Sequence, residues 1–321
     1  MASMRGEGER NDLEQAAELF TPLLLTTDEN FAPGHRACIG CGEALAVRHV
    51  CKALGTNVIV VNATGCIEIF SSLLPQTTWR LPWIHTLFEN VGAVVSGVES
   101  AYKARIRKGK IPDRGVKFVG IAGDGGTTDI GLQALSGALE RGHNILYCCF
   151  DNEAYMNTGI QRSSSTPYGA WTTTAPVGKH SIGQMTWKKN MPEIVVAHRI
   201  PYMATACPSY PLDLMEKVQK GLETEGPAYL HILSVCPTGW RCAPEETIEF
   251  GRLAVETGIF PLYEVINGDY RMSLDFPVLR PVKDYLRRQG RFRHLTEKDI
   301  DRIQARVDED YAKLREKAGV K

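Results

Sequence analysis

Short apolar runs alternate with stretches of helical periodicity along most of this chain, from about residue 34 to residue 260. Five runs rich in β-branched and apolar residues have the length of buried strands: residues 58–61, 118–121, 145–150, 202–206 and 228–235. Helical patterns lie between several of them, notably at residues 130–140 and 212–222. Short continuous apolar runs are typical of strands that are covered on both faces. The pattern therefore predicts an α/β fold with a mostly parallel sheet and helices on both faces.

Differences in pattern along the chain predict its division into segments. Residues 1–30 are polar and have no clear period, so we expect an N-terminal arm before a main domain at residues 31–260. Residues 261–321 form a C-terminal extension that we expect to contact another subunit. Within the main domain, residues 155–190 are rich in Gly, Ser, Thr and Pro, and such a long irregular segment in a compact domain is typical of a functional loop.

The C-terminal extension contains one strong helical signal. Thr296 and Asp299 have the spacing of a capping box. The apolar residues that follow at steps of three and four are Ile300, Ile303, Val307, Tyr311 and Leu314. This spacing predicts one amphipathic helix, which packs either on its own domain or on a partner subunit.

Composition and charge narrow the possible function classes. The chain has 321 residues with 37 basic and 37 acidic side chains, so it offers no electrostatic basis for binding nucleic acid. No apolar run approaches the ~20 residues that span a bilayer, and the leucine run at residues 23–25 lacks the basic flank of a signal peptide. We therefore expect a cytoplasmic protein without a membrane segment. Nine cysteines without a secretory signal favour metal or cluster ligation over disulfides.

Polar residues, glycines and cysteines follow the predicted strands. In an open parallel sheet, ligands bind beyond the carboxyl ends of the strands. The residues found directly after four of the predicted strands are Thr64, Gly65 and Cys66, then Gly123, Asp124 and Gly125, then Asn152, and finally Cys236. Their convergence predicts a functional site at one edge of the sheet.

The Gly123-Asp124-Gly125 turn is suited to a diphosphate group. Glycines allow the backbone to approach a ligand closely, and the following helix directs its first N–H groups at an anion. A carboxylate beside a diphosphate implies a bridging divalent ion, and Mg²⁺ prefers such oxygen ligands. Asn152 lies 28 residues after Asp124, a distance that can return the chain to the same edge, and the Ala154 carbonyl can be a third ligand. The alternative is a plain turn without a ligand.

The cysteines fall into two groups. Cys38 and Cys41 form a C-x-x-C element, which zinc and iron–sulfur sites both use. Because Cys66 and Cys236 are single cysteines at strand ends, a zinc ribbon with a second C-x-x-C element is disfavoured. The cysteines expected to be core residues are Cys51, Cys148 and Cys149, while Cys207 and Cys242 are weaker alternatives for a fourth ligand.

These motifs resemble a known family. The Gly-Asp-Gly turn followed by Asn152 is similar to the thiamine diphosphate signature. Residues 151–167 look like the cofactor loop of the pyruvate:ferredoxin oxidoreductase family, and residues 131–137 look like the helix after its Gly-Asp-Gly turn. The resemblance extends from about residue 34 to residue 292, which is most of the chain.

The resemblance implies the cofactors and their ligands. It implies thiamine diphosphate with Mg²⁺, and a [4Fe–4S] cluster close to the thiamine ring. Matched residue by residue, the cluster ligands are Cys38, Cys41, Cys66 and Cys236. The cofactor contacts implied in addition to the diphosphate turn are Thr64, Gly65, Phe88, Asn157 and Thr158.

Two of these implied contacts have defined roles and open alternatives. Asn157 would donate its amide to a developing enolate in the substrate pocket, or it would only stabilise its own loop. Phe88 would pack on the aminopyrimidine, or it would be an ordinary core residue. No spacing pairs His85, His143 or Glu89 with another catalytic group, so we expect these three to be structural.

The activity that the resemblance implies is reversible, CoA-dependent oxidative decarboxylation of pyruvate to acetyl-CoA and CO2, with electrons passing to ferredoxin. No glutamate matches the motif that activates the thiamine pyrimidine, and no ferredoxin-like run of cysteines is present. In multi-subunit members, these parts lie on partner subunits (alpha, gamma and delta). Residues 63–68 and 82–85 look more like pyruvate members than branched-chain 2-oxoacid members, and oxalate-acting members are also similar.

Two functions of other kinds stay open as alternatives. A thiamine enzyme without redox chemistry would not need the four cysteines, and an iron assay would distinguish it. A zinc-stabilised scaffold subunit without a cofactor would not need Asn152 at this distance from the Gly-Asp-Gly turn, and thiamine binding would distinguish it.

Overall fold

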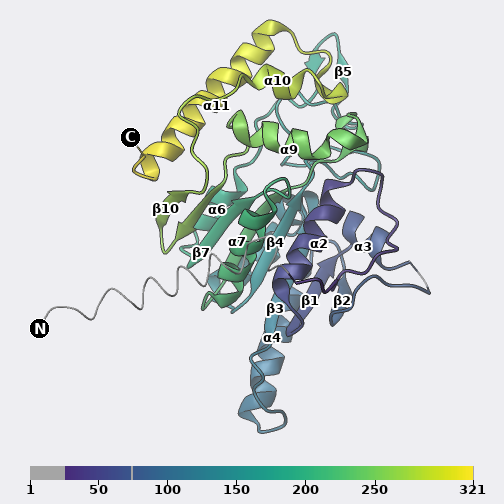
Figure 1. Ribbon diagram of the computed structural model, residues 1–321, viewed down its shortest axis with the longest axis vertical. Coiled ribbons are helices and arrows are strands. Elements are labelled where there is room, and N and C mark those ends of the chain that lie inside the picture. The colour runs from purple at the N-terminus through teal and green to yellow at the C-terminus, as the bar shows by residue number, and fades with distance from the viewer. Residues whose placement is uncertain (1–25, 74, 321) are drawn as a thin grey trace, which may run out of the picture.

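A single eight-stranded sheet forms the centre of the chain in the computed structural model, which describes residues 26–73 and 75–320 (Figure 1). From edge to edge the strands are β10 (Asp269–Met272), β9 (Tyr263–Ile266), β7 (Tyr202–Ala206), β8 (Ala228–Leu233), β4 (Leu146–Asp151), β3 (Lys117–Gly123), β1 (Val58–Ala63) and β2 (Trp83–Thr86). All neighbouring strands are parallel except β9, which runs antiparallel to β7 and to β10. The predicted mostly parallel α/β fold is confirmed.

Helices cover both faces of this sheet. On one face lie α2 (Gly42–Leu54) and α7 (Pro211–Glu223), and on the other lie α4 (Val91–Arg107), α5 (Leu132–Glu140) and α6 (Met191–Val196). Successive strand residues point to opposite faces, so Val60 packs with the first group and Val61 with the second. Both faces are apolar, which explains why the strands appear in the sequence as continuous apolar runs.

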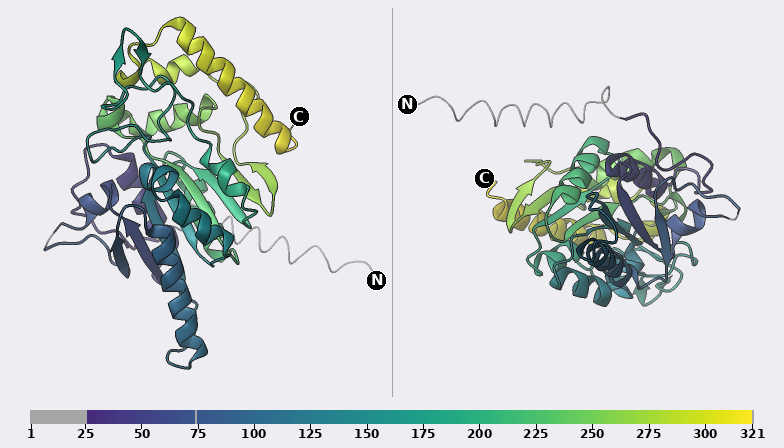
Figure 2. Two further views of the ribbon diagram at one scale, coloured as in Figure 1. Left: turned by 180° about the vertical axis from the view of Figure 1, so that it is seen from behind. Right: turned by 90° about the horizontal axis from the view of Figure 1, so that it is seen from below.

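A third cluster of buried residues lies beyond the sheet, under the C-terminal helices α9 (Thr247–Glu256), α10 (Val282–Leu286) and α11 (Glu297–Lys317). These helices lie at the end of the molecule to which the carboxyl ends of the parallel strands point (Figure 1). The left view of Figure 2, from behind, shows α11, in yellow, running across that end. The shorter elements are α3 (Cys66–Ser71), α8 (Pro237–Trp240), the hairpin of β5 (Val177–Gly178) and β6 (Ser181–Ile182), and helical turns at Gly125–Asp129, Pro244–Glu246 and Gly290–Phe292.

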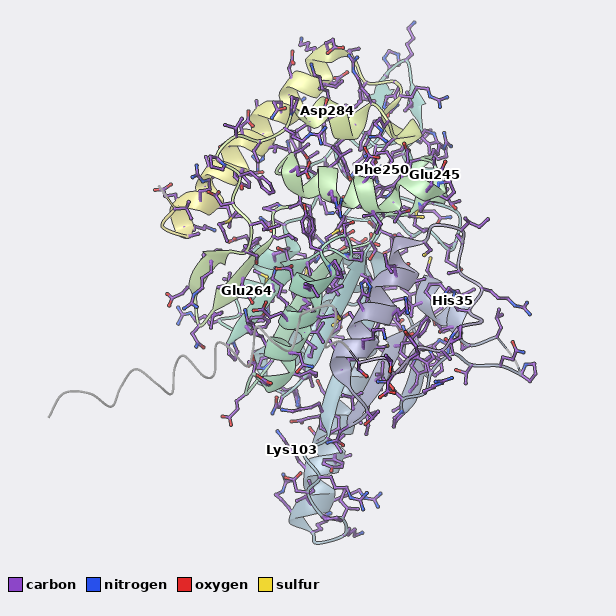
Figure 3. All side chains as sticks on the ribbon, in the orientation of Figure 1. His35, Lys103, Glu245, Phe250, Glu264 and Asp284 are labelled. Carbon is purple, nitrogen blue, oxygen red and sulfur yellow. The ribbon has the colours of Figure 1, made fainter. Side chains whose placement is uncertain are left out.

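The opposite end of the molecule carries a projection. The carboxyl-terminal half of α4, which bears Lys103, extends past the sheet (Figure 3). The chain then returns to the start of β3, so this projection lies away from the carboxyl ends of the strands. Among the residues that the structure describes, no helix has both the length and the apolar character needed to cross a membrane.

All five predicted strands are present, and β7 has the predicted bounds. The strands that were not predicted from the sequence are β2, the hairpin of β5 and β6, and the hairpin of β9 and β10. A signal for the last of these hairpins was available, because Asn267 and Gly268 form its two-residue turn with φ angles of 52° and 93°. Asn-Gly is the residue pair that a type I′ hairpin turn favours.

The predicted main domain and the predicted C-terminal extension share one sheet. Both β9 and β10 follow residue 260 and join the sheet, so the sheet uses residues from two of the predicted segments, and the division into domains stays a prediction. The predicted helix after Thr296 is present as α11 with its capping box, and Ile300, Ile303, Tyr311 and Leu314 are buried against the same chain. The N-terminal arm lies outside the described residues apart from residues 26–30.

Candidate functional site

One cavity opens beyond the carboxyl ends of β1, β3 and β4, three strands that are adjacent in the sheet. Each residue that was predicted to contact thiamine diphosphate or Mg²⁺ lines this cavity: Thr64, Gly65, Phe88, Gly123, Asp124, Gly125, Asn152, Ala154, Asn157 and Thr158. Cys66 lines it as well, and Glu43, Gly126, Tyr155 and Met156 complete the wall. The structure therefore brings the predicted cofactor residues together at the predicted edge.

The turn after β3 needs glycine for steric reasons. A Cβ atom on Gly125 would lie 2.4 Å from a ring carbon of Tyr155. The Tyr155 hydroxyl donates to the Asp129 carboxylate at 3.2 Å, and its ring stacks on Phe88 with centroids 5.7 Å apart. One π-helical turn at Gly125–Asp129 separates Gly123 from α5, which begins at Leu132, close to the predicted start at residue 130. Phe88 is thus a wall of the cavity rather than an ordinary core residue.

Asp124 is a buried carboxyl that forms no ion pair with the residues that the structure describes. It is 1% exposed, and the Ser163 hydroxyl donates to its Oδ2 atom at 2.5 Å. Burial raises its pKa well above the usual value, and the neighbouring Asp151 raises this pKa further, whereas Ser163 and Lys188 oppose the shift. A cation in the cavity would offset the burial cost, which fits a metal-ligand role for Asp124.

The Asn152 side chain supports the same conclusion. Its Nδ2 atom donates to the Glu43 Oε2 atom at 3.2 Å, and its backbone carbonyl accepts from the Trp240 indole at 2.9 Å. Its Oδ1 atom is buried and has no hydrogen-bond partner within the described chain. A buried acceptor without a partner costs about 1–3 kcal/mol. A hard cation beside Asp124 would satisfy this oxygen, so the residues present fit a magnesium site.

A network of buried charges holds the backbone next to Asn152. The Asp151 carboxylate contacts Lys188 Nζ at 2.5 Å and His231 Nε2 at 2.8 Å. Burial alone would raise the pKa of Asp151, but Lys188 and His231 hold it at about 2. On the other side of Asn152, Glu153 has a φ angle of 70°, which is unfavourable for a residue with a side chain.

Two ion pairs stabilise this strained position. The Glu153 carboxylate contacts Arg291 Nη2 at 2.6 Å and Lys188 Nζ at 2.8 Å. Arg291 and Glu153 are each 2% exposed, and the guanidinium also lies over the Trp240 ring at 4.1 Å. Arg291 belongs to the predicted C-terminal extension. That extension therefore anchors the cofactor loop from within the same chain.

Glu43 is a site residue that the sequence analysis missed. It lies in the first turn of α2, is 4% exposed and lines the cavity. Burial raises its pKa to about 7, while hydrogen bonds with Asn152 and Cys66 act in the opposite direction. An acidic residue on the same helix face as the buried Val47 and Val50 is unusual, and this pattern was a usable signal.

Three of the four predicted cluster cysteines lie at helix N-termini. Cys41 caps α2 and its sulfur accepts from the Ala44 N–H at 3.4 Å, and Cys236 caps α8 and accepts from the Gly239 N–H at 3.3 Å. Cys66 is the first residue of α3. Burial raises the pKa of Cys41 to about 12 and that of Cys236 to about 11, while the N–H groups at these positions act in the opposite direction. Cys38 is joined to this group by the C-x-x-C turn, in which the Cys41 N–H donates to the Cys38 carbonyl at 3.2 Å.

Cys66 lies close enough to Cys38, Cys41 and Cys236 for their charges to interact. Burial raises the pKa of Cys66, and Glu43, Cys236, Cys41 and Cys38 each raise it further, because a thiolate at Cys66 would face their negative charges. The close approach of α2 to the end of β8 explains part of this arrangement. The Gly42 N–H donates to the Val235 carbonyl at 3.0 Å, and a Cβ atom on Gly42 would lie only 2.8 Å from the Val235 backbone.

The spacing of these thiols differs from that of a single-metal site. Within residues 26–73 and 75–320, no three His, Cys, Asp or Glu side chains converge closely enough to hold one metal ion. A four-iron cluster is held by four cysteine thiolates, and because each binds a different iron, their sulfur atoms need not converge on one point. The observed neighbourhood of four cysteines is compatible with such a cluster.

The remaining five cysteines lie outside this group of four, and the structure also places the two histidines, His85 and His143. Cys51, Cys148 and Cys149 are fully buried core residues, as predicted, and Cys207 is buried in the cluster under α9. Cys242 is partly buried, and its principal charged neighbours are Arg291, Glu246 and Arg288. His143 pairs with Glu99 at 3.1 Å just before β4, whereas His85 shares a 2.8 Å hydrogen bond with Thr64 at the cavity.

Comparison with known proteins identifies the family of this chain. The family profile for the thiamine pyrophosphate enzyme, C-terminal TPP binding domain, matches residues 63–232. The pyruvate synthase subunit PorB of Methanocaldococcus jannaschii is 57% identical over 283 residues, which cover 88% of this chain and 95% of that protein. The chain belongs to the family of 2-oxoacid:ferredoxin oxidoreductase beta subunits.

Two further proteins are similar to this chain. The ketoisovalerate oxidoreductase subunit VorB of Pyrococcus abyssi is 49% identical over 310 residues, covering 96% of this chain and 99% of that protein. A solved 2-oxoglutarate:ferredoxin oxidoreductase from Magnetococcus marinus aligns with a TM-score of 0.55 at 24% identity, over 70% of this chain and 79% of that chain. At this identity the solved structure supports the fold alone.

In this beta subunit, Arg291→Met should destabilise the fold by up to about 3–5 kcal/mol, because it leaves the buried Glu153 carboxylate with only Lys188 as an ion-pair partner. The measurement is urea unfolding at neutral pH. Arg288→Met is the matched control: Arg288 pairs with Glu246 and Glu249 at the surface, where water screens the charges, so its loss should be much smaller. Equal losses in the two variants would contradict a structural role for the buried pair.

Proposed function

We propose that this chain is the thiamine-diphosphate-binding subunit of a cytoplasmic pyruvate:ferredoxin oxidoreductase, and that it carries Mg²⁺ and one [4Fe–4S] cluster. The observation on which the proposal depends is the position of Cys66. It lines the cavity of the predicted thiamine residues and is also a neighbour of the other three predicted cluster cysteines. A redox cluster beside a thiamine site would accept the electrons that oxidative decarboxylation of a 2-oxoacid releases. The strong similarity to proteins named pyruvate synthase subunits supports pyruvate as the substrate.

Different residues of the chain would bind the diphosphate, the metal ion and the pyrimidine ring. The backbone of the Gly123-Asp124-Gly125 turn would bind the diphosphate, and Asp124, Asn152 and the Ala154 carbonyl would hold Mg²⁺ against it. Phe88, stacked on Tyr155, would support the pyrimidine ring. When bound, thiamine diphosphate supplies the electron sink for decarboxylation of a 2-oxo acid.

The rim of the cavity would contact the substrate. Asn157 and Thr158 lie at this rim and are exposed, so their side chains can reach a ligand that enters from solvent. We assign to the Asn157 amide a hydrogen bond to the substrate oxygen. A hydrogen bond that strengthens as charge develops on that oxygen would lower the barrier to reaction.

The overall reaction balances through the cluster. Pyruvate and coenzyme A would become acetyl-CoA, CO2 and one proton, and the two electrons released would leave through iron–sulfur clusters to ferredoxin. Cys38, Cys41, Cys66 and Cys236 would hold the first cluster on this path. Partner subunits would supply the later clusters and the carboxylate that activates the thiamine pyrimidine.

A branched-chain 2-oxoacid is the second candidate substrate, because a ketoisovalerate oxidoreductase subunit is 49% identical to this chain. Oxalate is a further candidate within the family. A substrate panel on the assembled complex, with viologen as the electron acceptor, tests the choice. We expect pyruvate to give the highest kcat/KM, and a preference for 2-oxoisovalerate or oxalate would overturn the assignment of pyruvate.

The cluster assignment predicts iron content. Anaerobically purified chain should contain iron and sulfide at about four each per chain, the composition of a [4Fe–4S] cluster. Cys66→Ser should lower this content because it removes a ligand. Cys51→Ser, which changes a buried core cysteine, should leave it unchanged. Zinc in place of iron would instead support a scaffold subunit, and thiamine binding without iron would support a non-redox enzyme.

The magnesium assignment predicts a loss of cofactor affinity. Asp124→Ala removes the carboxylate that would bridge the metal, and it should weaken thiamine diphosphate binding at least ~10–100-fold, the range known for lesser changes around metal ligands. Calorimetric titration at fixed Mg²⁺ measures this. Asp113→Ala is a control, since that carboxylate lies in the exposed loop before β3. Native affinity in Asp124→Ala would refute the assignment.

The proposed need for partner subunits predicts that the isolated chain cannot turn over. Reconstituted with thiamine diphosphate, Mg²⁺, iron and sulfide, it should bind its cofactors but show no pyruvate- and CoA-dependent viologen reduction. Adding the partner subunits should restore the reaction. Full activity of the isolated chain would contradict the proposal, and it would mean that a carboxylate of this chain, with Glu43 the first candidate, activates the pyrimidine.

A further inference from the structure

Glu43 is a buried acid to which neither the diphosphate site nor the cluster assigns a task. It is the second residue of α2, and its carboxyl faces the cavity while nearby α2 residues such as Ala46, Val47 and Val50 pack in the apolar core. Burying a carboxyl group is costly unless it makes hydrogen bonds that repay desolvation. Its contacts should therefore reveal why the position is acidic.

The contact that matters is with the Asn152 amide. An asparagine side chain has two chemically opposite ends, because its nitrogen only donates and its oxygen only accepts. The Glu43 Oε2 atom accepts from Asn152 Nδ2 at 3.2 Å. This hydrogen bond fixes the nitrogen end of the amide toward Glu43. The Oδ1 atom consequently lies on the other side, where it is buried and without a hydrogen-bond partner in the described part of the chain.

Other contacts hold the Asn152 backbone without orienting its side chain. The Trp240 indole donates to the backbone carbonyl of Asn152 at 2.9 Å, and the neighbouring Asp151 and Glu153 are held by ion pairs. None of these three contacts involves the side-chain amide. Rotation by half a turn would exchange the amide's nitrogen and oxygen at little steric cost. A nitrogen end pointing at a cation would be repelled by it.

We propose that Glu43 is a positioning residue that orients the Asn152 amide so that its oxygen faces the metal ion. This inference deepens the proposed function and rests on its magnesium site. Glu43 acts through Asn152, and the geometry assigns it no contact with the metal. Because Glu43 directly follows Cys41 and Gly42, one turn of chain holds a cluster ligand and also orients a metal ligand.

The test compares Mg²⁺-dependent cofactor binding in four forms of the full chain, assembled with its partner subunits. These are the wild type, Glu43→Ala, Asn152→Asp and the double variant. Each is freed of metal with EDTA, and thiamine diphosphate binding is then titrated with MgCl2 by calorimetry. Iron content is measured alongside, to show that the cluster is intact in each form.

Glu43→Ala should raise the Mg²⁺ concentration for half-maximal binding about 10–100-fold, as expected when a group that orients a metal ligand is lost. Adding Asn152→Asp to Glu43→Ala should return this concentration to within a few-fold of the wild type. A carboxylate has two equivalent oxygens and needs no orientation, whereas a group that only supports the fold would not be replaced in this way. The single change Asn152→Asp should not improve binding, because it places the new carboxylate at position 152 beside the carboxylate of Glu43.

Glu264→Ala is the matched control, because Glu264 is another buried glutamate, on β9, where it accepts from the Tyr202 hydroxyl at 2.5 Å (Figure 3). It should leave the Mg²⁺ dependence unchanged. If Glu43→Ala does not assemble, Glu43→Met replaces it, since Met fills a similar volume without an acceptor.

The outcomes distinguish a failure of the proposed magnesium site from a failure of the proposed role of Glu43. Wild-type binding that does not respond to Mg²⁺ would overturn the magnesium site itself. A wild type that responds, combined with an unchanged Glu43→Ala variant or with no rescue by Asn152→Asp, would overturn only the positioning role of Glu43.

Discussion

The parallel pairing of β1, β3, β4 and β8 is the constraint on which the whole site depends. Their hydrogen-bonded register sets Ile121 beside Asn62, Gly123 beside Phe150 and Asp151 beside Leu233, so these strands end close together. The turns that follow must therefore meet at one edge. Segments separated by 170 residues, such as those that carry Cys66 and Cys236, are brought to the same edge of the sheet by this pairing.

A shortage of positive charge at this edge would favour binding of a cation there. Four buried carboxyl groups gather around the cavity and its loop, from Glu43, Asp124, Asp151 and Glu153. The ion pairs that serve them come from Lys188 and Arg291, and both engage the strand end and loop rather than Asp124. Because a metal ligand must be held in place before the metal arrives, the ion-paired loop and the Asp124 carboxyl would together suit the proposed magnesium site.

The sequence predicted those parts of the structure that have a local signature. Apolar runs located the five main strands, and the Gly-Asp-Gly turn with Asn152 at a set distance located the cavity. Arg291 could not be found in this way, because its partner Glu153 is 138 residues away and an ion pair leaves no periodic pattern. Glu43 could have been noticed as an acidic residue on the apolar face of its helix, but its role depends on the Asn152 amide, which only the folded chain brings to it. Likewise, β2 is a four-residue edge strand, too short for its periodicity to be recognised.

The central claim is that one edge of the sheet holds a metal–diphosphate site and an iron–sulfur cluster side by side on the same chain. Anomalous diffraction from anaerobic crystals of the assembled complex, grown with thiamine diphosphate and MnCl2 in place of MgCl2, tests it most directly. We predict an iron peak enclosed by Cys38, Cys41, Cys66 and Cys236, and a separate manganese peak between Asp124 and Asn152. Zinc at the cysteines, iron bound elsewhere, or manganese away from Asp124 would contradict the account.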